Sequence, residues 1–253
     1  MLPFRYNNFG ELEYLVHNHS VGVIKMEVSR NMGPADGFLQ KVRNLATQNR
    51  IVLIFDECTS GFRQTFGGLH KLYGVDPDMA LFGKALGNGY AITAVIGRRD
   101  VMQAAQSTFI SSTFWTERIG PTAALKALEV MERERSWERI TQTGLAIGER
   151  WQALARKYQL QLQLSGLPAL IGFTLSVPHM LKYKTLITQE MLKAGILATT
   201  EVYVCTEHTQ AVVDRYFEAL DPLFALIQQC EAGRSIDELL EGPVCHERFK
   251  RLN

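Results

Sequence analysis

The sequence predicts an α/β fold, in which helices cover a mostly parallel β-sheet, followed by a smaller C-terminal domain of helices and strands. Three observations lead to this prediction. In the first part of the chain, short apolar segments typical of strands alternate with a segment of helical spacing. The apolar run at residues 51–55 is continuous, which is typical of a strand buried on both faces of a parallel sheet. Longer helical segments and further short strands follow after about residue 113.

The first part of the chain contains four predicted strands and one predicted helix. Residues 21–27 read as a strand that ends on an acid, Glu27. After a Gly-Pro-Ala turn, Asp36 is a suitable N-cap for a helix over residues 37–48, whose apolar side chains share one face. The other strands are expected at residues 51–55, 79–82 and 92–96.

The second part of the chain has longer helices and a mixed character. Helices are predicted at residues 118–133, 137–158, 185–194 and 209–230. Strands are predicted at residues 160–164, 170–175, 196–198 and 202–205. This change of character predicts a domain boundary near residue 140, and 253 residues suffice for a large domain (1–140) and a small one (141–253).

Composition excludes several classes of protein. A formal net charge of +1 leaves no basic excess to neutralise phosphates, which argues against binding to nucleic acid. The four cysteines are scattered without a CxxC pair, so neither a metal site nor a disulfide framework is expected. No apolar stretch approaches the length of a membrane span, and the N-terminus lacks a signal pattern. A cytoplasmic protein without a membrane partner is therefore expected.

A lysine and an acid at two strand ends form the candidate chemical site. Lys84 lies between glycines just after the strand at 79–82, 28 positions beyond Asp56, which follows the strand at 51–55. The carboxyl ends of parallel strands meet at one edge of a sheet, where ligands bind. A carboxylate facing a pyridine nitrogen keeps that ring cationic, and a lysine confined in the same pocket becomes a nucleophile. The pair suggests a pyridoxal-phosphate (PLP) enzyme, with Lys84 forming the Schiff base. The alternative is a helix cap or solvated loop at Asp56 and a surface lysine.

The residues around this pair resemble a known signature. It consists of the ordered segments DECTSGFR at 56–63, Gly-Gly at 67–68, YGVDPD at 73–78 and GKALGNG at 83–89. These segments closely resemble the signature of the class III PLP-dependent aminotransferases, and most closely the branch that contains glutamate-1-semialdehyde aminomutase. The flanking segments at 38–43, 192–197 and 207–209 agree with it.

The resemblance implies a fold-type I enzyme, normally a homodimer with active sites at the subunit interface. It assigns Lys84 to the Schiff base and Asp56 to the pyridine nitrogen. Cys58 falls where the family usually has a valine against the ring face. Thr59 falls where many members carry a glutamine that reaches the ring hydroxyl, so that contact is shortened or lost here. Thr113 matches a threonine that binds the cofactor phosphate of the partner subunit, the alternative being an ordinary loop hydroxyl.

The resemblance also implies a cofactor-binding large domain over residues 1–140 and a reaction that moves an amino group from a small-molecule donor to a carbonyl acceptor. The chain matches the C-terminal three-fifths of such an enzyme, and the segment that carries the family's phosphate-binding loop has no counterpart in it. We therefore expect the isolated chain to bind PLP weakly or not at all. A non-catalytic remnant of the fold is the alternative, and a decarboxylase or racemase is a third possibility.

Four further residues are weaker candidates. Glu27 matches a family acid on the substrate side, and a salt-bridging role is an equal alternative. Arg30 and Arg63 have the bidentate geometry that suits a substrate carboxylate, although structural ion pairs are favoured. His208, beside Glu207 at a helix start, is expected to be structural.

Overall fold

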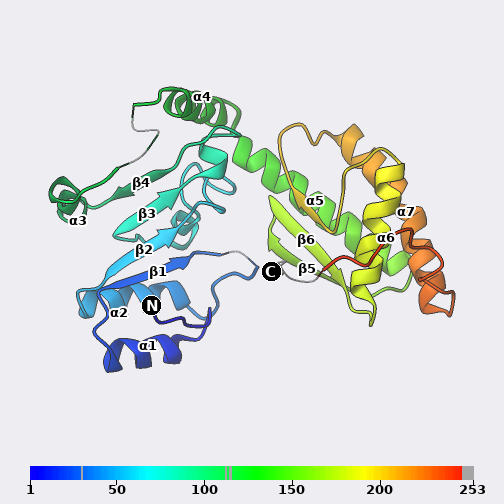
Figure 1. The fold of residues 1–253 in the computed structure, drawn as a ribbon, viewed down its shortest axis with the longest axis horizontal. Helices are drawn as coiled ribbons and strands as arrows, with labels where there is room; N and C mark the ends of the chain where they lie inside the picture. Colours follow the sequence, from blue (N-terminus) through cyan, green and yellow to red (C-terminus); the bar gives the residue numbers. More distant parts are fainter. Residues whose placement is uncertain (30, 112, 114–115, 247–253) are drawn as a thin grey trace. The chain divides into compact units, whose positions relative to one another are not determined.

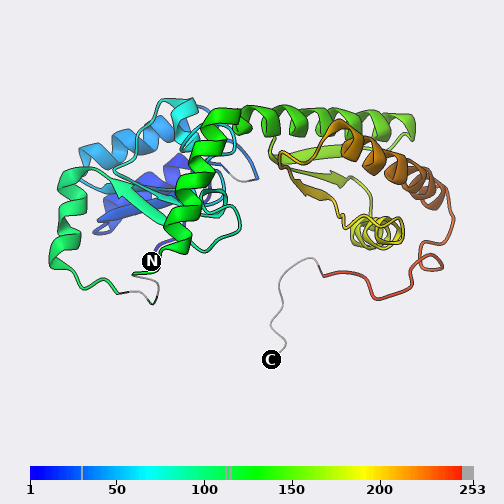
Figure 2. The ribbon, with the colours of Figure 1, turned by 90° about the horizontal axis from the view of Figure 1, so that it is seen from above.

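The computed structural model describes residues 1–29, 31–111, 113 and 116–246. The chain divides into two compact units, Met1–Glu138 and Arg139–Asn253. The sequence predicts a domain boundary near residue 140. Figures 1 and 2 show the elements of each unit from two directions. Among the described residues, no helix combines the length and the apolar character needed to cross a lipid bilayer.

The first unit contains a four-stranded sheet in the order β1-β2-β3-β4. The first three strands are parallel, and β4 runs antiparallel to β3. The strands are β1 (Val23–Glu27), β2 (Val52–Asp56), β3 (Met79–Phe82) and β4 (Ala94–Gly97). The helices are α1 (Phe9–Asn18), α2 (Phe38–Gln48), α3 (Arg99–Met102) and α4 (Ile119–Glu134), and 3-10 turns cover Leu69–Tyr73, Lys84–Leu86 and Gln103–Ser107.

One face of this sheet is buried and the other is partly open. Helix α2 packs against β2, and α1 packs against α2, on the side seen beside β1 in Figure 1. The buried face carries apolar residues at alternate positions: Ile24, Met26, Leu53, Phe55, Ala80 and Phe82. The opposite face carries residues that stay partly accessible: Lys25, Glu27, Ile54, Asp56, Met79 and Leu81. The expectation that β2 is buried on both faces is therefore wrong for the described chain, because its helices cover β2 on one side.

Three local expectations in the first unit differ from the structure. Asp36 is not the N-cap of α2, because its φ of +49° leaves it in the left-handed region and the helix begins after Gly37 instead. Helix α1 was not expected. It is capped by the side chain of Asn8, which accepts the backbone N–H of Glu11 at 3.2 Å. Strand β4 begins at Ala94, two residues later than expected.

The second unit has its own sheet and its own core. Strands β5 (Leu162–Leu167), β6 (Leu170–Leu175) and β7 (Glu201–Tyr203) form an antiparallel sheet in that order. Its helices are α5 (Ser136–Lys157), α6 (Met180–Lys193) and α7 (Gln210–Glu231). The core includes Trp151 of α5 and Phe224 of α7, both fully buried. Residues 196–198, expected as a strand, form no strand, and Ile196 and Ala198 pack against this core instead.

Close packing between α5 and the β5–β6 turn depends on a glycine. A Cβ atom added at Gly144 would lie 1.8 Å from the backbone oxygen of Pro168. A backbone atom cannot move aside as the end of a flexible side chain can. The helix therefore approaches the turn this closely only because residue 144 has no side chain.

Candidate functional site

The ends of β2 and β3 bring the predicted site residues together. Asp56 is the last residue of β2, and it is the register partner of Leu81 in β3. Lys84 follows β3 after a single residue, Gly83, and begins a short 3-10 turn. Since the two strands are parallel and adjacent, both side chains start from the same edge of the sheet.

Asp56 has both carboxylate oxygens engaged. Oδ2 lies 2.8 Å from Nζ of Lys25 in β1, and Oδ1 accepts the backbone N–H of Cys58 at 3.2 Å. Burial alone would raise the pKa of Asp56, but the hydrogen bonds from Lys25 and Cys58 outweigh it and hold the pKa below its usual value. Asp56 is therefore a carboxylate at neutral pH.

Lys84 lies within hydrogen-bonding distance of Thr59. Its ammonium donates to Oγ1 of Thr59 at 2.6 Å. Its backbone has a φ of +45°, the left-handed region that is uncommon for a lysine and is often found at functional sites. Lys84 is exposed, so the expectation of a confined amine is wrong for the described chain. The physical reason is that its turn projects beyond the carboxyl end of β3.

Cys58 lies close to both groups. Its backbone N–H donates to Oδ1 of Asp56, and its thiol lies beside Gly83, the residue before Lys84. Burial raises the pKa of the Cys58 thiol, and the nearby Asp56 carboxylate raises it further, so Cys58 is a neutral thiol at pH 7. A neutral, compact side chain at this point suits contact with the face of an aromatic ring.

The residue next to Asp56 is a buried acid. Glu57 is fully buried, and its carboxylate accepts three hydrogen bonds. The donors are the Ser60 hydroxyl at 2.5 Å, the His70 backbone N–H at 3.0 Å and the His70 ring at Nδ1 at 2.8 Å. Burial acts to raise the pKa of Glu57, but these hydrogen bonds lower it below its usual value. A Cβ at Gly68 would lie 2.4 Å from the His70 ring, so the second glycine of the Gly-Gly pair makes room for this contact. Sequence reasoning did not find the network, and the adjacent acids at 56–57 were its only signal.

Of the other predicted residues, Thr113 and Arg63 belong to the first unit and His208 belongs to the second. Thr113 is exposed in a turn. Arg63 donates from Nε to the backbone oxygen of Thr59 at 3.4 Å, and Arg30 lies outside the described residues. In the second unit, Nδ1 of His208 accepts the backbone N–H of Cys205 at 3.0 Å, which supports a structural role.

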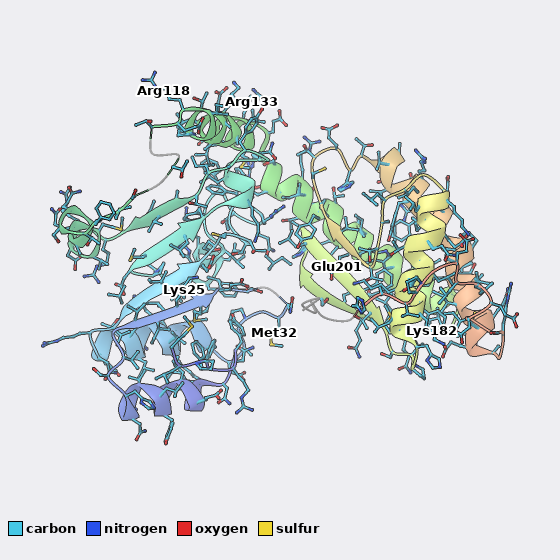
Figure 3. The ribbon with its side chains drawn as sticks, in the orientation of Figure 1. Lys25, Met32, Arg118, Arg133, Lys182 and Glu201 are labelled. Atoms are coloured by element: carbon cyan, nitrogen blue, oxygen red, sulfur yellow. The ribbon has the colours of Figure 1, made fainter. Side chains whose placement is uncertain are left out.

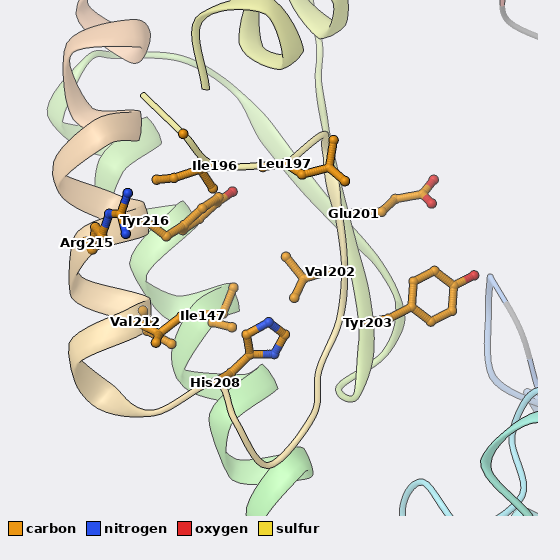
Figure 4. Close-up of a pocket in the computed structure, with 13 residues that line it drawn as sticks. Ile147, Ile196, Leu197, Glu201, Val202, Tyr203, His208, Val212, Arg215 and Tyr216 are labelled. Atoms are coloured by element: carbon orange, nitrogen blue, oxygen red, sulfur yellow. The ribbon is translucent and has the colours of Figure 1, made fainter. Parts of the chain in front are cut away.

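The second unit holds a separate, mainly apolar pocket of about 520 Å³. Figure 4 shows Ile147 of α5, Val202 of β7, and Val212 and Tyr216 of α7 around it, with His208 at the start of α7. None of the cofactor-site residues predicted from the sequence lines this pocket.

Comparisons with known proteins show which family this chain resembles. The class-III aminotransferase family pattern matches residues 14–212. Over 240 residues the chain is 31% identical to a 3-aminobutyryl-CoA aminotransferase of Cloacimonas acidaminovorans, covering 89% of this chain and 58% of that protein. It is 28% identical to a glutamate-1-semialdehyde 2,1-aminomutase of Ruminiclostridium cellulolyticum, covering 85% of this chain and 55% of that protein. The chain thus spans less than three-fifths of the length of these two relatives.

Solved structures confirm the predicted fold. The FumI protein of Sphingopyxis sp. MTA144, solved in its PLP internal aldimine form, matches with a TM-score of 0.85 at 20% identity, covering 92% of this chain and 59% of that one. A β-phenylalanine aminotransferase from Variovorax paradoxus matches with a TM-score of 0.76 at 23% identity, covering 92% and 58%. These structures establish the fold-type I transaminase architecture for the part of the fold that the chain contains. With the family pattern matched over residues 14–212, the chain belongs to the class-III aminotransferase family.

Proposed function

We propose that this chain carries the lysine and the ring-binding groups of a PLP-dependent enzyme that transfers an amino group from a small-molecule donor to an aldehyde or keto acceptor. The observation that carries the proposal is the placement of an ionised Asp56 and of Lys84 at the ends of two adjacent parallel strands. Membership of the class-III aminotransferase family supports the proposal, because amino-group transfer is the reaction for which the family is named.

The residues present fit the ring of PLP. Asp56 supplies an anionic oxygen for a protonated pyridine nitrogen, and Cys58 supplies a neutral side chain for contact with the ring. Lys84 supplies the amine for the aldehyde carbon, and Thr113 is proposed to donate to the phosphate of a partner subunit. Bound PLP would supply the electron sink that stabilises negative charge at the substrate α-carbon.

The chain's own groups have distinct tasks in such a reaction. Thr59 accepts a hydrogen bond from the Lys84 ammonium at 2.6 Å, and so fixes the direction of the amine. Once a substrate amine has replaced it, free Lys84 would move the α-proton as a general base. Asp56 would keep the ring nitrogen protonated, since a carboxylate whose pKa is lowered stays charged at neutral pH.

Borohydride trapping tests the proposal directly. The chain is incubated with PLP over a range of concentrations, reduced, digested and mapped by mass spectrometry. We expect the pyridoxyl mass to appear on Lys84 at lower PLP concentration than on Lys126, an exposed lysine on α4 that serves as an internal control. In Lys84→Ala the site peptide should carry no label, while Lys126 is labelled as before. Equal labelling of Lys84 and Lys126 would contradict the proposal.

The exposure of Lys84 favours a second candidate, a chain that keeps the fold without turnover. In that case the amine has ordinary surface reactivity, and neither lysine is preferred in the trapping experiment. The two candidates therefore predict different labelling patterns in one measurement.

We also propose that the active form is a homodimer. The segment around Thr113 carries large apolar side chains at the surface: Phe109, Ile110, Ile119 and Leu125. Phe109 is 93% exposed and Leu125 is 71% exposed, and burying such side chains favours association by roughly 1.5–3 kcal/mol each. Coverage by a second copy would bring Thr113 to the other subunit.

A further inference from the structure

Lys25 of β1 faces the candidate site. The parallel register pairs Glu27 with Asp56, and side chains two residues apart on a strand share a face, so Lys25 lies on the same face as Asp56. Figure 3 marks Lys25 on β1. Its Nζ lies 2.8 Å from Oδ2 of Asp56, with the lysine side chain 54% exposed and the aspartate side chain 23% exposed.

This ion pair uses the carboxylate that is proposed to receive the cofactor's ring nitrogen. The other oxygen, Oδ1, accepts the backbone N–H of Cys58 at 3.2 Å. A protonated pyridine nitrogen approaching Asp56 can displace the Lys25 ammonium from Oδ2, or bind the carboxylate beside it through Oδ2 or the second lone pair of Oδ1. Displacement costs Lys25 its ion pair, and shared binding places two cations at one carboxylate, so Lys25 opposes binding of the ring in each case.

We propose that Lys25 is a positioning residue that holds the Asp56 carboxylate and competes with the ring nitrogen of PLP for it. The proposal rests on the proposed function, because it takes Asp56 as the partner of the ring. It makes Lys25 a residue that sets cofactor affinity.

The surrounding charges keep Lys25 cationic. Besides its ion pair with Asp56, Lys25 interacts electrostatically with Glu27. The hydrogen bond to Asp56 raises the pKa of Lys25, with the charge of Asp56 acting in the same direction, so its amine stays protonated at neutral pH. Lys25 therefore remains a cation that pairs with Asp56.

The test compares three variants across a series of PLP concentrations, with borohydride labelling of Lys84 as the measure of binding. Lys25→Met keeps the length of the side chain without its charge, Lys25→Arg keeps the charge, and Lys41→Met removes an exposed lysine from α2 as a control. Removing a charge about 4 Å from a cation in solvent is expected to lower the half-labelling concentration roughly 5- to 10-fold in Lys25→Met. Lys25→Arg and Lys41→Met should match the unsubstituted chain.

A half-labelling concentration in Lys25→Met equal to or above that of the unsubstituted chain would overturn the proposal, as would no labelling of Lys84 in either. A ¹³C NMR titration of Asp56, which needs no PLP, separates the two failures. If Lys25→Met raises the Asp56 pKa but Lys84 is never labelled, the proposed function has failed. If Lys84 is labelled with an unchanged concentration dependence, the role of Lys25 alone has failed.

Discussion

Replacing Glu57 with glutamine should destabilise the first unit without altering its shape. The carboxylate accepts Ser60 Oγ and two N–H groups of His70, and it is fully buried. A glutamine keeps these contacts but loses the charge, and each hydrogen bond to a charged group is stronger than a neutral one by about 1 kcal/mol. Three such bonds give about 3 kcal/mol, and relief from burying a charge offsets part of it. We expect a net loss of about 1–3 kcal/mol.

Hydrogen exchange measures this loss in the unit concerned. Peptides covering β2 and the turn at Leu69–Tyr73 should lose protection by roughly 5- to 150-fold in Glu57→Gln, since 1.4 kcal/mol corresponds to a factor of ten. Peptides from the second unit report independently. Glu129→Gln, which changes an exposed acid paired with Lys126 on α4, is the matched control and should leave protection unchanged.

The loss should also depend on pH, with a defined sign. Burial acts to raise the pKa of Glu57, but its hydrogen bonds hold it below the ordinary value of 4.5 in the folded chain. Below pH 4.5 the unfolded chain therefore binds the proton more readily, and stability falls as the pH falls. The contribution is complete above that pH and disappears as the pH drops through the folded pKa. Protection that matched the unsubstituted chain at pH 7, or a difference that persisted unchanged in acid, would refute this reasoning.

Two further outcomes are expected. Gly144→Ala should lower the melting temperature of the second unit, at a cost of about 3 kcal/mol, because the added Cβ would lie 1.8 Å from a backbone oxygen. The control Gly10→Ala on α1, where no atom lies closer than 4.0 Å to the added Cβ, should leave this melting temperature unchanged. Equal melting curves for the two variants would be inconsistent with this packing. Sedimentation of the unsubstituted chain should show a dimer, and Leu125→Glu should dissociate it. The control Leu192→Glu, at an exposed leucine of the second unit, should leave the dimer intact. A monomer in every case would exclude the dimer.

The elements that sequence predicted best are those with the clearest local signals. Strands β3 and β6 have the predicted bounds, because each is a short apolar segment between turn residues. Residues 196–198 are equally apolar, yet they pack on the core without a strand partner, a distinction that only tertiary contacts make. Helix α1 escaped prediction although Asn8 and Glu11 supply an N-cap pattern that could have revealed it.

The candidate site shows the same division. The order of motifs along the chain led to Asp56 and Lys84, and their roles remain proposals. The contact between Lys84 and Thr59 and the ion pair between Lys25 and Asp56 were not predicted. Both depend on register and side-chain direction, which a pattern of residue types does not contain.

The register between β2 and β3 also restricts how this site can change over evolution. Asp56 lies opposite Leu81, so the offset between the acid and the lysine is set by main-chain hydrogen bonding. Adding or deleting one residue inside β3 would turn the side chains that follow it to the other face of the sheet. The side chain of Lys84 would then point away from Asp56. Length variation should therefore be excluded from the two strands and also from residues 57–70 of their connection, which hold Thr59 and the contacts between Glu57 and His70.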